Sequence, residues 1–135
     1  LLLRAGQGQN TSAPPRLEGA LRAGSPEFEH YKGRVVLDPP EAVEGARTVG
    51  DMWMQLETTV RNFTGRSIDG LELTGTVVDP TGAPIRERTV VFIPGQQSEL
   101  ENNKTMKVRL VLEGISKDAV RADIKMAVAG VKFKN

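Results

Sequence analysis

The side chain most often used for proton transfer near neutral pH is histidine, and this chain of 135 residues contains one, His30. A Ser-His-Asp triad needs its histidine held by packed neighbours, and a zinc site usually needs several imidazole or thiolate ligands. His30 lies between Glu29 and Tyr31, where the folded region is predicted to begin. We therefore predict that His30 is a solvated side chain outside any catalytic or metal site.

Acidic side chains gather in one predicted loop, and carboxylates could bind calcium or hydrolyse a glycosidic bond. They are Asp38, Glu41, Glu44 and Asp51. Calcium takes about six to eight oxygen ligands, and this spacing fits no known calcium loop. Nothing selects a pair of carboxylates for glycoside hydrolysis, although a hydrolase with convergent carboxylates in a concave pocket stays an alternative. We predict no catalytic residues, no metal and no cofactor, and hence a protein that is not an enzyme.

Three Asn-x-Ser/Thr triplets, the acceptor pattern for N-glycosylation, begin at Asn10, Asn62 and Asn103. The last two lie at predicted turns, where Asn and Thr side chains bond locally to the backbone. We favour the turn interpretation for these two. Glycosylation is the alternative in a eukaryotic secretory setting.

Two aromatic residues, Trp53 and Tyr31, are the candidates for an interaction surface. Trp53 is out of phase with the apolar face of its predicted strand, and exposed aromatics recur at binding hot spots. If Trp53 and Tyr31 were exposed on one face, they could bind a carbohydrate or another ligand. The alternative is that Trp53 is covered by the N-terminal segment or by a second sheet, since large aromatics are mostly well buried.

Composition limits the functions that this chain could have. Charged residues make up 26% and hydrophobic residues 39%, as in ordinary globular domains. The net charge is +1 and the two signs are mixed along the chain, whereas nucleic-acid binding needs a clustered basic face. Without cysteine there are no disulfides and no Cys-based sites. The chain contains no run of about 20 apolar residues of the kind that spans a bilayer.

The elements that must position these side chains are predicted to be strands. Apolar and polar residues alternate from residue 52 to residue 60, which places one set in a core and the other outside. The inward set is Met52, Met54, Leu56, Thr58 and Val60.

A second long strand is predicted over residues 68–78, with Leu71, Leu73 and Val77 facing inward. Gly75 interrupts that face, which indicates a β-bulge or a close approach of the backbone. The remaining predicted strands cover residues 34–37, 84–93, 106–112 and 122–133.

Turn chemistry separates the strands at residues 62–65 (Asn-Phe-Thr-Gly) and 79–82 (Asp-Pro-Thr-Gly). Residues 41–50 are predicted as a loop with at most a short edge strand near residues 47–49. The last strand is expected at a sheet edge, where it could pair with another chain unless its lysines prevent this.

Six to seven strands with a turn about every ten residues predict an antiparallel, immunoglobulin-like β-sandwich. Residues 1–27 are predicted as a flexible linker and residues 28–135 as the sandwich domain, since Pro14-Pro15 favours extended backbone. The three leucines that open the chain are expected to end a membrane anchor or signal segment upstream. The alternative is an arbitrary start of the chain.

The strand and turn pattern resembles the bacterial FxLYD domain over residues 52–112. The matching segments are residues 60–64, 71–73, 77–82, 100–104 and 106–108. The family's namesake Leu-Tyr-Asp is replaced here by Val77-Val78-Asp79. The resemblance implies an immunoglobulin-like sandwich outside the bacterial cytoplasm, often behind a membrane anchor, with no catalytic residues.

From these observations we expect a non-enzymatic, membrane-tethered module, periplasmic or on the cell surface, that acts as a spacer or a protein-interaction domain. The partner would be another protein or a second copy of the chain, with no nucleic acid. Contact with a membrane would come only through a segment upstream of Leu1. The alternative is a carbohydrate- or ligand-binding accessory domain.

Overall fold

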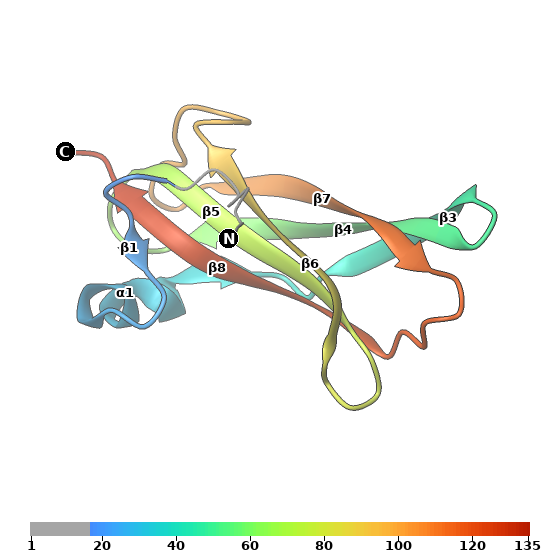
Figure 1. Ribbon diagram of the computed structural model, residues 1–135. Helices are drawn as coiled ribbons and strands as arrows, with labels where there is room; N and C mark the ends of the chain where they lie inside the picture. The colour runs from blue at the N-terminus through green and yellow to red at the C-terminus, as the bar shows by residue number, and fades with distance from the viewer. Residues whose placement is uncertain (1–16) are drawn as a thin grey trace, which may run out of the picture.

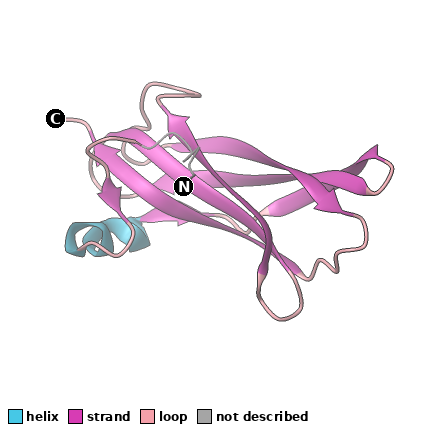
Figure 2. Ribbon diagram, in the orientation of Figure 1, coloured by secondary structure: helices cyan, strands magenta, loops and turns pink. Residues whose placement is uncertain are grey.

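The computed structural model describes residues 17–135, except for the side chains of residues 47 and 48, and shows two antiparallel β-sheets packed face to face (Figures 1 and 2). The predicted all-β sandwich is confirmed, with eight strands in the described residues where six to seven were expected. The elements are β1 (Leu21–Arg22), α1 (Pro26–Tyr31), the 3-10 turn η1 (Lys32–Arg34), β2 (Val35–Leu37), β3 (Glu41–Thr48), β4 (Asp51–Asn62), β5 (Ile68–Val78), β6 (Pro84–Ile93), β7 (Thr105–Ser116) and β8 (Asp123–Phe133).

Along two long sides of the sandwich, an edge of one sheet lies next to an edge of the other. The first sheet has the order β1-β8-β5-β6. In the second sheet, β4 pairs with β7 along one edge, and with β3 and then β2 along its other edge. One long side of the sandwich therefore brings β6 against β7, and the other brings β8 opposite β2.

The core lies between the sheets and is built from the predicted inward faces. The five residues of β4 that were predicted to face inward are all buried, and Leu71, Leu73 and Val77 of β5 are fully buried. A Cβ atom on Gly75 would lie 3.0 Å from the side chain of Leu110 and 3.1 Å from that of Leu56. Gly75 therefore marks a close approach of the two sheets.

The turn after β4 is organised by Asn62, which is fully buried. Its amide nitrogen donates to the carbonyl oxygens of Arg66 (2.8 Å) and Leu100 (2.9 Å), and its Oδ1 accepts from the backbone N–H and the hydroxyl of Thr64. Because this amide nitrogen is buried and bonded on both sides, the structure supports the turn interpretation of this triplet over glycosylation.

The predicted turn at residues 79–82 is also present. The Asp79 carbonyl accepts from the Gly82 N–H at 2.9 Å, and Gly82 has a φ of 87°. The Asp79 carboxylate accepts from the hydroxyl and the N–H of Thr81 and from the N–H of Ala83. These bonds, led by that from the Thr81 side chain, lower the pKa of Asp79.

Residues 41–48 form a strand, so the prediction of a loop over this range was wrong, and only residues 49 and 50 make a turn. This strand, β3, pairs with β4 from Glu41 opposite Glu57 to Ala46 opposite Met52. Residues 41–44 of β3 are all exposed, so its sequence has no apolar alternation. The strand is held by backbone pairing at a sheet edge, at the end of the molecule away from α1 (Figure 1).

Residues 17–27, part of the predicted linker, lie on the sandwich. β1 pairs with β8, and α1 begins at Pro26, so the predicted boundary at residue 27 falls inside this helix. The Ser25 hydroxyl caps α1 by accepting from the Phe28 N–H at 3.2 Å, and proline suits the first helical position. The first 16 residues, with the three leucines, lie outside the described residues.

Residues 17–22, called the N-terminal segment below, are fixed by Glu72 on the outer face of β5. This carboxylate is 2% exposed, accepts from the Leu17 N–H at 3.0 Å and pairs with the Arg22 guanidinium at 2.6 Å. The same guanidinium donates to the Leu17 carbonyl at 2.8 Å. Gly70 leaves the necessary room, because a Cβ atom there would lie 2.6 Å from the Leu17 side chain.

Candidate functional site

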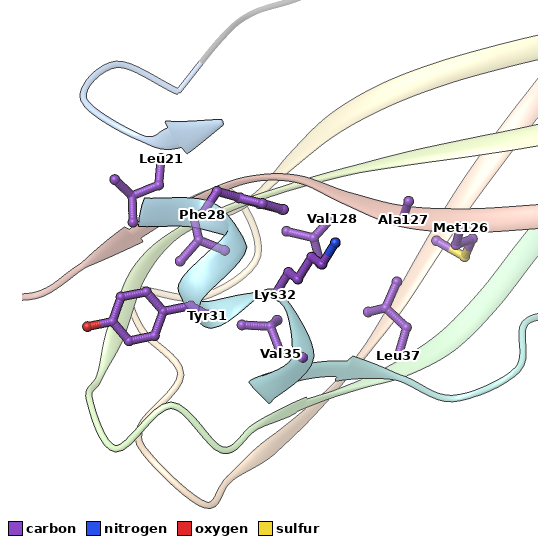
Figure 3. A pocket seen from close by; sticks show the side chains of 11 residues that line it. Leu21, Phe28, Tyr31, Lys32, Val35, Leu37, Met126, Ala127 and Val128 are labelled. Atoms are coloured by element: carbon purple, nitrogen blue, oxygen red, sulfur yellow. The ribbon is translucent and has the colours of Figure 1, made fainter. Parts of the chain in front are cut away.

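An apolar groove of about 450 Å³ opens on the side of the sandwich where β8 lies opposite β2, and we call it the β2/β8 groove (Figure 3). Its lining combines β1, α1, η1, β2 and β8. The lining residues are Leu21, Phe28, Tyr31, Lys32, Gly33, Val35, Leu37, Met126, Ala127, Val128 and Val131. One groove of this size with an apolar wall suits a ligand or peptide side chains better than water.

The groove exists because the two sheets are not closed along this side. Ile124, Met126 and Val128 occupy alternate positions of β8 and pack against the core, yet each is only half-buried. The inward residues of β5, the neighbouring strand, are fully buried. β8 therefore presents Met126 and Val128 to the groove, and Ile124 continues the same half-open face beyond the groove lining.

The helix α1 closes one end of the groove. Phe28 is buried, and the Tyr31 ring lies 4.6 Å from the Phe133 ring, centroid to centroid. The Arg66 guanidinium lies 4.4 Å from the centroid of Phe133 on its ring face, a cation–π contact. This cluster ties the helix to the last strand and so holds Tyr31 at the groove wall.

Charge is scarce in the groove. Of the described residues that line it, Lys32 alone has a charged side chain, and its ammonium pairs with Glu29 at 2.7 Å. Carboxyl groups with a lowered pKa lie elsewhere: Asp38 beside Arg61 and Glu57 beside Arg109, each lowered mainly by a hydrogen bond from that arginine. This lining offers apolar contact and holds no pair of groups for acid–base chemistry.

The opposite side of the sandwich, which we call the β6/β7 edge, has different chemistry. Side chains of β6 and of the loop after it donate to backbone carbonyl groups of β7. Arg86 bonds to the Gly114 carbonyl at 2.6 Å, and Arg88 bonds to the Val111 carbonyl at 3.0 Å. Gln96 donates to the Lys107 carbonyl at 2.8 Å. Polar side chains thus cover the edge of β7.

The structure does not bring Trp53 and Tyr31 together. Trp53 is half-buried on the outer face of β4, where a Cβ atom on Gly45 of β3 would lie 2.6 Å from its ring. Its place outside the core is therefore explained by cross-strand packing on glycine. Tyr31 lies near the other end of β4, about 30 Å away at about 3.3 Å per strand residue.

The other sequence candidates are also dispersed. His30 is exposed beside Tyr31. Asp38 accepts from Arg61 at 2.9 Å, and Glu44 pairs separately with Arg121 at 3.3 Å. In residues 17–135 no group of three or more His, Asp or Glu side chains is placed to hold a metal ion.

The sequence places Met126 and Val128 on one face of the last strand but does not mark them, or Phe28, as site residues. A usable signal was present, because Ser25-Pro26-Glu27 is a helix start and places Phe28 on the first turn. The alternation in residues 122–133 gave an inward face for β8. Nothing in the sequence shows that this face stays half-open, because that depends on which strand lies beside it.

Comparisons with known proteins give no assignment. No protein-family model matches the chain, and no curated protein matches it significantly. It is similar to a solved structure described as "X-ray structure of Northeast Structural Genomics Consortium target SoR45", with 11% identity over 76% of this chain and 87% of that chain and a TM-score of 0.45. A similarity of that size supports no inference about function. No helix within residues 17–135 is long and apolar enough to cross a bilayer.

Proposed function

We propose that this chain is a non-enzymatic protein-interaction module and that the β2/β8 groove is its binding surface. The observation that carries the proposal is a groove of about 450 Å³ whose wall is apolar and whose single charged residue is already paired with Glu29. Binding proteins use such apolar concave surfaces, with few polar groups, to take up side chains of a partner.

The proposal includes the setting inferred from the sequence. We take the chain as a bacterial, immunoglobulin-like module similar to FxLYD domains, placed outside the cytoplasm and tethered to a membrane. The support is the turn pattern at residues 60–64 and 77–82, which resembles that of the FxLYD domain. Expression of the complete gene with a reporter fusion, followed by cell fractionation, tests this part separately.

The test of the binding function is selection of peptides from a random display library on the whole chain. The matched variant is Gly33→Phe, because Gly33 lines the groove and a Cβ atom there meets nothing within 4 Å. The phenylalanine is expected to fill part of the groove without a clash. Peptides that bind the natural chain and lose affinity for Gly33→Phe support the proposal, whereas a selection that yields no binder contradicts it.

A further inference from the structure

We infer that the β2/β8 groove takes an extended peptide as an added strand on the free edge of β8, with alternate apolar residues in the groove and an acidic residue beside Lys125. This inference rests on the proposed function, because it names the kind of partner that the same groove would bind.

One edge of β8 is largely unpaired. Along its other edge, β8 pairs with β5 from Asp123 to Phe133. On the free edge, β1 supplies two pairs, Leu21 with Val131 and Arg22 with Gly130, and the Ala23 N–H donates to the Ala129 carbonyl at 3.3 Å. In the described part of the chain, residues 123–128 have no strand on that side. Such an edge offers backbone groups to an incoming strand.

A strand added there would enter the groove with every second side chain. The inward side chains of β8 in this stretch are Ile124, Met126 and Val128, all half-buried. Residues directly opposite in neighbouring strands have Cβ atoms about 5 Å apart, so the added residues would pack beside these three. Across the groove they would meet Leu37 of β2, which Figure 3 shows facing Met126. The partner therefore needs apolar residues at alternate positions.

The outer face of the same edge carries an unpaired cation. Lys125 is exposed, and in residues 17–135 its ammonium has no ion pair. Opposite charges on adjacent strands stabilise the pairing, whereas like charges weaken it. An acidic residue between the apolar positions of the partner would complement Lys125.

A second copy of the chain fits this edge less well. Two copies could pair through residues 124–128 around a two-fold axis at Met126. That register places the two Lys125 side chains diagonally across from each other and Ala127 directly opposite each of them, so neither lysine meets an acid. Lysine at an edge is a common protection against pairing with like chains. A two-fold axis at Ile124 would instead place each Lys125 opposite Asp123 of the other copy, but because β8 begins at Asp123 it would pair only residues 123–125 and leave Met126 and Val128 uncovered. A separate acidic strand can pair with Lys125 and cover the groove at the same time.

The test uses three labelled nine-residue peptides in which threonine and valine alternate, with glutamate, glutamine or lysine at the centre. Their affinity is measured by fluorescence polarisation with the whole chain. The natural chain is expected to bind the glutamate peptide about fivefold more tightly than the lysine peptide, the size of one cross-strand charge pair. Lys125→Glu is expected to reverse this preference. Lys132→Glu, which makes the same charge change on β8 beside the β1 pairing, is expected to keep it.

The outcomes separate the inference from the proposed function. Suppose that all three peptides bind with equal affinity and that Gly33→Phe loses this binding. The groove would then remain a peptide site, but the predicted preference for an acidic residue beside Lys125 would be contradicted. A dimer in analytical ultracentrifugation that these peptides dissociate would overturn it in favour of a second copy. If display selection yields binders that require the groove but none of the three peptides binds, the added-strand geometry is wrong.

Discussion

The two long sides of this sandwich are built from edge strands of the same two sheets, yet one is covered by polar side chains and the other is open and apolar. At the β6/β7 edge, Arg86 and Arg88 donate to carbonyl groups of β7. At the β2/β8 groove, half-buried Met126 and Val128 face a groove of about 450 Å³. Unpaired backbone groups at an edge invite another strand unless something covers them. Within residues 17–135, the fold therefore covers one edge with polar side chains and leaves the other edge largely unpaired.

The largest expected difference between the two sides is the loss of stability when an inward side chain is shortened. Leu112 on β7 is fully buried, so Leu112→Ala should lower the free energy of unfolding by about 3 kcal/mol through lost contacts and a cavity. Met126 on β8 is half-buried, so Met126→Ala should cost about 1 kcal/mol. Urea denaturation of both variants checks this. Equal losses would mean that the groove is closed in solution.

The second effect concerns the N-terminal segment, which borders the groove through Leu21. Glu72→Ala removes a buried carboxylate that pairs with Arg22 at 2.6 Å and accepts from the Leu17 N–H. We expect a loss of about 2 kcal/mol, below the usual value for a buried pair because the Arg22 side chain is 31% exposed. Urea denaturation measures the loss, and proteolysis should cut the detached segment first. Glu72→Gln is the control, since an amide oxygen can still accept from Leu17. An unchanged unfolding midpoint in Glu72→Ala would contradict this role.

A smaller effect is expected where arginines cover β7. The double variant Arg86→Ala/Arg88→Ala loses two charge-assisted hydrogen bonds between exposed groups, and we expect about 1 kcal/mol of destabilisation. Lys125→Ala on the open side should change the free energy of unfolding by less than about 0.5 kcal/mol. Thermal denaturation of both variants would sharpen the comparison. If Lys125→Ala lowered the free energy of unfolding more than the arginine variant does, the predicted difference between the two sides would be wrong.

The smallest effect is a pH dependence at the end of β2. The hydrogen bond from Arg61 holds the pKa of Asp38 below its ordinary value. A carboxyl group with a lowered folded pKa stabilises the protein above its unfolded pKa of about 4, and this contribution is lost as the pH falls through the folded pKa. Asp38→Asn should therefore flatten the fall in the urea midpoint below about pH 4. An unchanged pH profile would show that the pair forms too rarely to matter.

The strands with one buried face could be predicted from the sequence, whereas β3, which is exposed on both faces, could not. Met54, Leu56, Leu71 and Leu73 alternate with polar residues because the core lies on one side only. β3 shows no such alternation, since both of its faces are exposed, and it was predicted as a loop. A strand that is exposed on both faces is specified mainly by backbone pairing, which leaves little trace in residue type.

The candidate site was predictable only in part. Tyr31 was identified as an aromatic residue, but its role at the groove wall depends on contact with Phe133, which lies far along the chain. Trp53 was identified from its phase in β4, and the partner that explains its position, Gly45, lies in the strand that the sequence did not reveal. Neither placement follows from local pattern, because each is set by which strands become neighbours.

The most direct test of the central claim is nuclear magnetic resonance of the ¹⁵N-labelled chain during titration with the glutamate-centred peptide. We predict that the amide shift changes concentrate at residues 123–129 of β8 and residues 35–37 of β2, while the amide shifts of β6 and β7 stay unchanged. Changes centred on the β6/β7 edge or around Trp53 would contradict it, as would a spectrum that saturating peptide leaves unchanged.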